Sequence, residues 1–366
     1  MADGFERNVH CLLGLPFDAV DMAGAVSRIR GAVTRRQSCF LSTPNLNFLV
    51  ACLTDEAFRD SVIESDLSIA DGTPIVWVAR LLRVPIRERV AGSGVFEELR
   101  RGNRGQISVF FFGGMEGVAE AACKGLNSDP SGLVCVGYEN PGFGSVEEMS
   151  SDETIARINA SAADFVVVSL GARKGQAWIS RNRTRLSATV ISHLGAVMNF
   201  VAGTVSRAPL WVQRSGLEWL WRIMEEPTLW RRYFADGLAF LWLLVTRVAP
   251  YSWIILCQRR SRTELEAAEV GLLDHDAEVV IRLRGAWVLE NLRPLRECFA
   301  RPILAGKDVR LEMEHVTYVD SAFIGLLMLL YGDRTRHGRR FSIGNPTKRI
   351  RRIFRYACAE FLLDAR

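Results

Sequence analysis

Short apolar segments alternate with helix-like segments through the first two hundred residues, and this alternation limits the fold more than any other feature of the chain. A brief, continuous apolar run bounded by turn residues is typical of a buried strand. Strands that alternate with helices form a mostly parallel sheet. We therefore predict an α/β fold, with strands at Cys39–Ser42, Leu67–Ala70, Ile107–Phe112, Val134–Gly137, Phe165–Ser169 and Thr189–Ser192, and helices including Ala19–Thr34, Gly117–Leu126 and Asp152–Ala162.

The composition changes at Pro209. Six of the nine tryptophans fall between Trp211 and Trp253, and Gly237–Leu256 is a twenty-residue apolar segment with one arginine and one proline. About twenty apolar residues are enough to span a bilayer, although an internal Arg and Pro disfavour a clean span. Aromatic residues and flanking arginines favour a helix or helical hairpin in the membrane interface. A buried or oligomer-facing helix pair and a true span are the alternatives.

A second α/β unit follows a polar, Glu-rich segment. We predict an α/β domain over residues 1–208, a helical membrane-associating appendage over 209–260, a linker over 261–274 and a small domain over 275–366. The small domain is expected to have strands at Glu278–Leu283, Val309–Met313 and Phe341–Ile343, and helices at Val288–Ala300, Ser321–His337 and Thr347–Leu363.

Basic residues are concentrated in two regions. Residues 205–262 contain nine arginines and four acidic residues, and residues 334–355 contain nine Lys or Arg and no Asp or Glu. Such clusters suit phosphate, anionic lipid or nucleic acid, while a solvated helix face is the plain alternative for the second cluster. The eight cysteines have no CxxC pair and the histidines are isolated, so no zinc-type spacing exists. We expect mostly buried thiols, no metal, and, without an apolar signal segment at residues 1–10, a cytosolic protein.

Two polar segments that follow predicted strands are candidates for an active site. Ser42-Thr43-Pro44-Asn45 stands where open α/β sheets bind ligands, although it also makes an ordinary helix cap. Asp71, before the flexible Gly72, is placed to serve as the base that deprotonates a sugar hydroxyl; capping the next helix is the equal alternative.

Two further segments suit a bound diphosphate. Gly113-Gly114 connects a strand to a helix start, where backbone N–H groups can approach phosphate, although an ordinary tight turn has the same pattern. Farther along, arginines are mixed with aromatic and glycine residues, which suits a pyrophosphate near a membrane. The candidates in this region are Asn199, Arg207, Arg214, Arg222, Arg231 and Arg232.

The order of these motifs resembles that of the WecG/TagA/CpsF glycosyltransferases, glycosyltransferase family 26. The resemblance covers Cys11 to Arg247 and rests on Thr-Pro-Asn, Asp-Gly, Arg89-Val90-Ala91-Gly92, Phe-Gly-Gly, Leu170-Gly171, Arg-Ala-Pro, Gly-Leu-Glu-Trp and Arg-Arg-Tyr. It implies a Rossmann-like domain and an inverting, metal-independent transfer from a UDP-sugar to a polyprenyl-diphosphate-linked saccharide. No cofactor is expected besides the UDP-sugar substrate. The family also implies a position on the inner face of the cytoplasmic membrane and a tendency to oligomerise.

The resemblance assigns roles to the candidate residues. Asp71 would be the general base, with Thr43 and Asn45 in the same cleft; Gly113 and Gly114 would lie near the donor nucleotide. The five arginines from Arg207 to Arg232 fall in the family's C-terminal appendage, which closes over the site and touches the membrane. Arg89 and Asn199 are further substrate-binding candidates.

One motif departs from the family pattern. Where the family has Gly-x-Pro-Lys-Gln-Glu before a Trp, this chain has Gly171-Ala172-Arg173-Lys174-Gly175-Gln176-Ala177-Trp178. Gly175 therefore occupies the Gln position, and Gln176 is the candidate to replace that side chain. A different donor sugar is one expected consequence.

The last ninety residues resemble a STAS domain, the fold of anti-sigma-factor antagonists, through Val316-Thr317-Tyr318-Val319-Asp320-Ser321-Ala322-Phe323-Ile324-Gly325. Ser321 matches that family's phosphorylation site, and Asp320-Ser321 is also ordinary helix-cap chemistry. The domain is expected to bind a protein partner or small ligand. A degenerate transferase that acts as a STAS signalling adaptor is the main rival hypothesis; nucleic-acid binding is disfavoured because the second basic cluster has few aromatic residues for base stacking.

Overall fold

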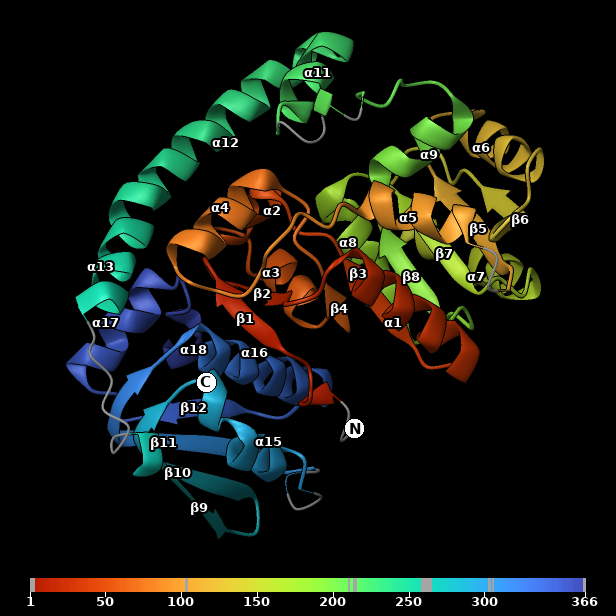
Figure 1. The fold of residues 1–366 in the computed structure, drawn as a ribbon. Coiled ribbons are helices and arrows are strands. Elements are labelled where there is room, and N and C mark those ends of the chain that lie inside the picture. The colour runs from red at the N-terminus through yellow and green to blue at the C-terminus, as the bar shows by residue number, and fades with distance from the viewer. Residues whose placement is uncertain are drawn as a thin grey trace.

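The computed structural model describes residues 4–102, 105–209, 211–212, 216–257, 265–301, 304 and 306–364. A six-stranded, fully parallel sheet forms the centre of the first domain, in the order β4-β3-β8-β7-β5-β6 (Figure 1). Its strands are β3 (Cys39–Ser42), β4 (Leu67–Ser68), β5 (Ile107–Gly113), β6 (Leu133–Glu139), β7 (Phe165–Ser169) and β8 (Val190–His193). All six predicted strands are thus confirmed; β3 and β7 have the predicted ends, and the ends of the other four differ by at most two residues.

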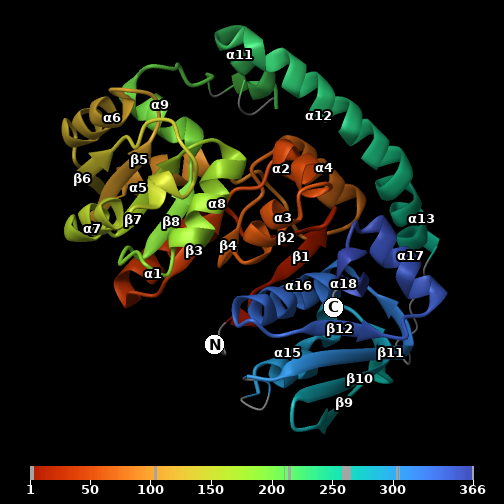
Figure 2. The same cartoon turned by 180° about the vertical axis from the view of Figure 1, so that it is seen from behind.

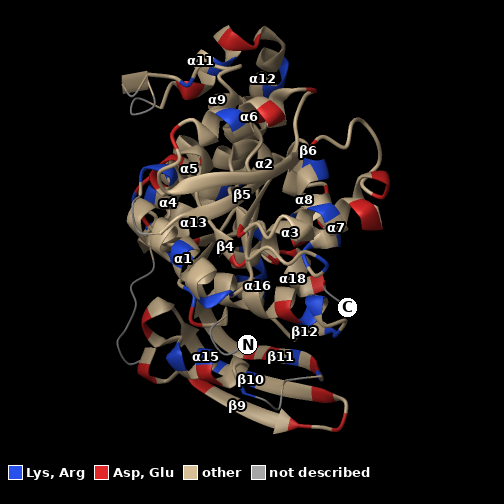
Figure 3. Ribbon diagram, turned by 90° about the vertical axis from the view of Figure 1, so that its right-hand side faces the viewer, with Lys and Arg blue, Asp and Glu red and all other residues tan. Residues whose placement is uncertain are grey.

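Helices cover both faces of this sheet, as expected when strands are buried on both sides. One apolar cluster joins the sheet to α1, α5, α6 and α9, and another joins the opposite face to α7 and α8. Strand β5 carries no charged residue, and Lys, Arg, Asp and Glu lie on the surrounding helices and loops (Figure 3). The helices are α1 (Met22–Arg35), α2 (Leu46–Cys52), α3 (Glu56–Ile63), α4 (Thr73–Leu81), α5 (Gly92–Arg101), α6 (Val118–Asn127), α7 (Asp152–Ala160), α8 (Ala172–Asn182) and α9 (Gly195–Ala202).

The C-terminal domain has a four-stranded sheet in the order β12-β11-β10-β9. Its strands are β9 (Glu269–Asp274), β10 (Glu278–Trp287), β11 (Asp308–Val319) and β12 (Phe341–Gly344), and its helices are α15 (Arg293–Phe299), α16 (Ser321–Arg336), α17 (Lys348–Tyr356) and α18 (Phe361–Asp364). Strand β9 lies in the segment predicted as a linker, where it pairs antiparallel with β10. The predicted helix over 347–363 is interrupted at Cys358, which has a left-handed φ of 55°.

The two domains share one hydrophobic core. The hairpin of β1 (Val9–Leu12) and β2 (Leu15–Asp18) packs against α16 of the C-terminal domain, between the two sheets (Figure 2). Gly325 permits this contact, because a Cβ atom there would lie 2.4 Å from the carbonyl oxygen of Val9. Asp18 is fully buried beside Arg7 and Arg28, at 2.6 Å from each, and fixes the hairpin to the first domain.

One long helix runs along the outside of the molecule from the first domain to the second (Figure 1). It comprises η3 (Pro227–Leu229), α12 (Trp230–Leu243), a π-helical turn η4 (Leu244–Val248) and α13 (Ala249–Cys257), and α11 (Glu218–Glu225) precedes it. The π turn immediately precedes Pro250, whose missing N–H and bulky ring disturb the regular α-helical bonding. The structure therefore has one continuous helix here rather than a hairpin.

Cysteine usage differs from the expectation of free thiols at one pair. Cys123 of α6 and Cys135 of β6 form a disulfide with Cα atoms 5.2 Å apart, a separation that a disulfide requires. Helix α6 and strand β6 are consecutive in the chain and pack against each other, which brings the two residues together. The other six cysteines are free, and four of them are buried.

Candidate active site

The polar residues predicted after the first two strands of the sheet lie next to each other. Strands β3 and β4 are paired in parallel, and beyond them the N–H of Asp71 donates to the carbonyl of Pro44 at 3.0 Å. Asn45 caps α2 by accepting a hydrogen bond from Phe48 N–H, and a Cβ on Gly72 would lie 3.8 Å from the Asn45 Cβ. Thr43, Asn45 and Asp71 thus share the carboxyl-end edge of the sheet, where α/β folds bind ligands.

Asp71 is the centre of a charged cluster. Its Oδ1 accepts from Nη2 of Arg89 at 3.2 Å, its Oδ2 accepts from Gly92 N–H at 3.2 Å, and Arg89 Nη1 donates to Glu218 at 2.6 Å. Burial raises the pKa of the Asp71 carboxyl, while the Arg89 charge and the Gly92 N–H oppose that shift. A carboxylate with a raised pKa is a stronger base, which suits proton abstraction near neutral pH.

A second arginine approaches the same place from the other side of α5. Gly92 is the first residue of α5, and a Cβ on Gly94 would lie 3.9 Å from Nη2 of Arg207. The Arg207 Nε is buried and has no hydrogen-bond partner in the described part of the chain. Arg207 and the N-terminus of α5 thus contribute positive potential on this side of the site, which favours a phosphate-bearing ligand, while the Arg89 charge is offset by the carboxylates of Asp71 and Glu218.

The predicted glycine turn lies farther along the same edge. Gly113 and Gly114 have φ of 94° and 85°, and the Gly114 N–H donates to the carbonyl of Ser169 at the end of β7. A Cβ on Gly114 would lie 2.7 Å from the sulfur of Met198, so α9 packs directly on this turn. Asn199 follows in α9, where its carbonyl accepts the N–H of Thr204. The turn and Asn199 therefore form a second part of the edge, across β7 and β8 from Asp71.

The departure from the family motif at Gly175 is accompanied by a close contact with His193. A Cβ at Gly175 would lie 2.3 Å from Cδ2 of the His193 ring, so the imidazole occupies the space next to that position. The His193 Nε2 is buried without a hydrogen-bond partner among the described residues, and burial lowers the pKa of His193 to about 4. The ring is therefore neutral at physiological pH.

Gln176 points into the sheet edge beside Thr43. It is 1% exposed, and its Nε2 donates to the Ser42 hydroxyl at 3.2 Å. Its Oε1, like the His193 Nε2, is buried and unpaired in the described structure. Two buried polar atoms without a hydrogen-bond partner at one edge of the sheet are unusual, since buried polar atoms are nearly always hydrogen-bonded.

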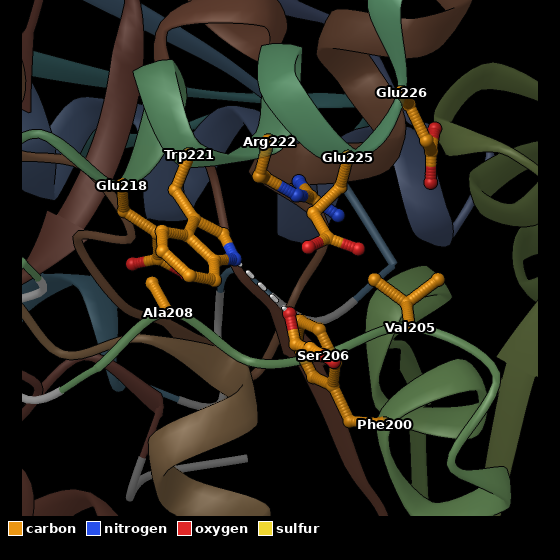
Figure 4. A pocket seen from close by; sticks show the side chains of 9 residues that line it. All are labelled: Phe200, Val205, Ser206, Ala208, Glu218, Trp221, Arg222, Glu225 and Glu226. Atoms are coloured by element: carbon orange, nitrogen blue, oxygen red, sulfur yellow. Dashed lines mark hydrogen bonds between the residues drawn. The ribbon is translucent and has the colours of Figure 1, made fainter.

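Three of the remaining predicted arginines lie on α11 and α12, and Arg222 is on the same helix as Glu218. Arg222 lines a small pocket with Glu218, Trp221 and Glu225, where the Trp221 indole donates to the carbonyl of Ser206 at 3.3 Å (Figure 4). Arg231 and Arg232 are exposed at the start of α12, over the rings of Trp230 and Tyr233. Arg214 lies outside the described residues.

An open groove lies beside the long helix. It is bounded by α2, the start of α8 and α12, and Asn47 Nδ2 donates across it to Asp236 Oδ2 at 3.1 Å. Asn47 is two residues from Asn45. The groove therefore lies between α2 and the apolar helix, on the helix that Asn45 caps.

Ser321 lies at the contact between the two domains. Its hydroxyl is 3.1 Å from Nδ1 of His10, whose Nε2 is 3.1 Å from Asn8 Oδ1. Because the Asn8 oxygen can only accept, Nε2 carries the proton and the Ser321 hydroxyl donates to Nδ1. Asp320 caps α16 by accepting from Phe323 N–H, as the structural alternative for this motif predicts.

Two residues of the site were not predicted as site residues. Glu218 was visible within the Gly-Leu-Glu-Trp motif, but only the fold shows that it bonds to Arg89. His193 had no signal, because its proximity to Gly175 depends on the packing of α8 against β8. Within the described residues, no three His, Cys, Asp or Glu side chains are grouped to hold a metal ion.

A parallel sheet with a carboxylate–arginine cluster at its carboxyl edge, and a second α/β domain beside it, is typical of a two-domain α/β protein that binds a ligand at that edge. Comparison with protein families identifies the family of each domain. Residues 10–252 match the Glycosyl transferase WecG/TagA/CpsF family, and the chain belongs to that family. Residues 270–363 match the Mlab, STAS domain family.

Characterised relatives share this first domain. The chain is 28% identical over 202 residues to an N-acetylglucosaminyldiphosphoundecaprenol N-acetyl-beta-D-mannosaminyltransferase of Bacillus subtilis, covering 55% of this chain and 77% of the relative. Proteins of the same description from Bacillus spizizenii and Staphylococcus aureus are 27% and 24% identical, over 54% and 60% of this chain and 76% and 85% of their own lengths. The glycosyltransferase resemblance and the STAS resemblance are thus both confirmed.

Proposed function

We propose that the chain transfers a sugar from a UDP-sugar to a polyprenyl-diphosphate-linked saccharide, with inversion, in the synthesis of a bacterial surface or exopolysaccharide. The observation that carries the proposal is the Asp71–Arg89–Glu218 cluster at the carboxyl edge of the sheet. The relatives' names specify an acceptor with a diphosphate-linked polyprenol and a β-linked product. Inversion of an α-linked donor gives a β-linked product, which agrees with a single displacement.

The proposed step uses Asp71 as the general base. The Asp71 carboxylate takes the proton from an acceptor hydroxyl as that oxygen bonds to the anomeric carbon of the donor. The bond between this carbon and the diphosphate oxygen breaks, and UDP leaves with the electron pair. Arg89 holds Asp71 in place, and Gly92 N–H donates to its second oxygen. We propose that Arg207 offsets part of the diphosphate charge and that the transfer needs no metal ion. The Gly114 N–H already donates to Ser169, so the Gly113–Gly114 turn would lie near the donor nucleotide without donating that N–H to it.

The appendage is proposed to bring the enzyme to the inner face of the cytoplasmic membrane. Pro227–Cys257 is long and apolar enough to cross a bilayer by length and composition, and only 17% of its most apolar window is buried. Its exposed large side chains include Phe234, Leu238, Leu241 and Val245, a spacing that places them along one face. A contiguous exposed apolar surface of this kind marks an interaction site.

The opposite face of the same helix is tied to the protein, which favours a helix lying on the membrane over one that crosses it. Asp236 bonds to Asn47 of the first domain, and Arg247 donates to the carbonyl of Arg355 at 2.7 Å in the second. Leu243 is buried between these points, and Tyr251 is buried one turn beyond Arg247. A spanning helix would lose all of these contacts and would bury Arg247 in hydrocarbon.

UDP release by the purified protein tests the transferase proposal. UDP-N-acetylmannosamine and other UDP-sugars would be combined with short-chain polyprenyl-diphosphate N-acetylglucosamine. We expect acceptor-dependent release that persists in EDTA and falls by about 10²–10⁴-fold in Asp71→Asn, since that is the usual contribution of a general base. Asp164→Asn is the matched control, because Asp164 bonds only structural groups, Ser108 among them, at the opposite edge of the sheet.

Two outcomes would contradict the proposal. Equal activity in Asp71→Asn and the wild type would remove Asp71 from the chemistry. A protein that binds no UDP and releases none with any donor would support the rival hypothesis of a STAS signalling adaptor.

A further inference from the structure

Part of the second basic cluster forms one exposed face of α17. Five of the nine residues of this helix are Lys or Arg, and all five are exposed: Lys348, Arg349, Arg351, Arg352 and Arg355. Ile350, Ile353 and Phe354 form the buried face. Helix α17 is thus strongly amphipathic, with an uninterrupted cationic surface and an apolar side fixed to the domain core.

Three of these five charges have no ion-pair partner among the residues that the structure describes. The side chains of Lys348, Arg351 and Arg352 make no ion pair with any residue that the structure describes. Like charges at spacings of three and four residues repel each other on a helix. Because the repulsion costs stability and these three side chains have no internal ion pair, the cationic face of α17 indicates an anionic partner outside the protein.

The position of α17 indicates which anionic partner this is. Helix α17 packs beside η4 and α13 of the long apolar helix, and both ribbon views show the two helices together (Figures 1 and 2). Arg247 fixes the contact by donating to the Arg355 carbonyl, with Glu360 Oε2 at 3.5 Å. Exposed Trp253 and Leu256 lie on α13. Cations next to exposed apolar and indole side chains match the headgroup and acyl regions of a bilayer.

We propose that α17 is an anionic-lipid binding site, and that the STAS domain thereby holds the transferase on negatively charged membrane. The proposal rests on the membrane placement proposed above and adds a lipid preference to it. The long helix supplies apolar contact with any bilayer, whereas α17 supplies attraction only to a surface with negative headgroups. Nucleic acid fits less well, because its recognition would leave the adjacent apolar side chains uncovered.

Vesicle binding of the full chain tests the proposal. The probes are phosphatidylcholine vesicles with and without phosphatidylglycerol. Each charge near an anionic surface contributes roughly fivefold to partitioning, so the triple variant Lys348→Gln/Arg351→Gln/Arg352→Gln should bind anionic vesicles on the order of 100-fold less tightly. Binding to neutral vesicles should be unchanged, and glutamine preserves helix propensity. Added salt should weaken wild-type binding to the anionic vesicles.

A matched control separates a local site from net charge. Arg282→Gln/Arg284→Gln/Arg301→Gln removes three exposed charges from β10 and the end of α15 in the same domain, so both triple variants have the same net charge. An equal loss in the two variants would overturn the proposal, as would no loss in the α17 variant. Wild-type binding to duplex DNA that exceeds vesicle binding, and that is lost in the α17 variant, would assign the surface to nucleic acid instead.

UDP release with a water-soluble acceptor analogue distinguishes this proposal from the proposed function. Both triple variants should retain wild-type release, since none of the substituted residues lies at the Asp71 edge. Absence of release in every protein would refute the transferase proposal and leave the vesicle comparison unaffected.

Discussion

Replacing Gly325 with alanine tests whether the shared core depends on the close approach of α16 to strand β1. A Cβ at this position would lie 2.4 Å from the Val9 carbonyl oxygen and 3.0 Å from His10 Cα. The hairpin would have to retreat by at least 0.6 Å to bring the first distance to 3.0 Å. Because the obstructing atoms are backbone, no side-chain rotation can relieve the contact.

Two effects of opposite sign determine the result. Alanine is favoured over glycine in a helix interior by about 1 kcal/mol. Overpacking a well-filled core costs about 1–3 kcal/mol, and backbone displacement places this site in the upper part of that range. We therefore expect a net loss of about 1–2 kcal/mol in the free energy of unfolding.

Gly237→Ala provides the control. Gly237 lies within α12, and a Cβ there would meet nothing within 4 Å, so only the helix-propensity term applies. That variant should be more stable than the wild type by about 0.5–1 kcal/mol. Because both substitutions gain the same propensity, the difference between them isolates the clash and should be about 2–3 kcal/mol.

Guanidinium denaturation followed by far-ultraviolet circular dichroism measures both variants. If Gly325→Ala is as stable as Gly237→Ala, the reasoning from the α16–β1 contact is refuted.

Three further predictions concern the active site and the contact between the domains. Transfer should decline as pH falls through the raised pKa of Asp71, because the base must be ionised. The apparent pKa of kcat should exceed the ordinary aspartate value of about 4. An acid limb at or below that value would contradict the role of burial. Gly175→Gln should lower the melting temperature, because the new Cβ meets the His193 ring. Adding His193→Gly to this variant should restore stability. If stability is not restored, the two positions are not coupled. Ser321→Asp should lower the free energy of unfolding by about 1–3 kcal/mol in chemical denaturation, because a carboxylate would replace the hydroxyl that donates to His10 at 3.1 Å. Ser321→Ala should cost less. Equal losses in the two variants would argue against a charge-sensitive contact.

The sequence predicts the repeating part of the fold well because buried parallel strands have a strong local signal. The six strands of the first sheet were recognisable as short apolar runs, and their carboxyl ends bring Thr43, Asn45 and Asp71 together, as the topology requires. Strand β9 was missed because it lies at an exposed edge, with an alternating pattern that resembles a polar linker.

The contacts between distant segments were not predictable in the same way. The bond between Arg89 and Glu218 joins residues 129 positions apart, and the Asn47–Asp236 bond spans 189 positions. The β1–β2 hairpin is short and lies outside both sheets, so nothing local shows that it packs on the C-terminal domain. Arg222, Arg231 and Arg232 are assigned to substrate binding by their position in the family's appendage, and that role stays a prediction. The structure shows Arg222 in a small pocket with Glu218, and Arg231 and Arg232 exposed at the start of α12.

The single core shared by the two domains has a consequence for genetics. Truncation before residue 265 would remove the C-terminal domain and also strip the covering from Val9, Cys11 and the rest of the β1–β2 hairpin. The truncated product would expose apolar surface and become a substrate for cellular proteolysis. A deletion phenotype would therefore report the abundance of the enzyme as much as its control, and point substitutions on the α16 face are the cleaner way to separate the two.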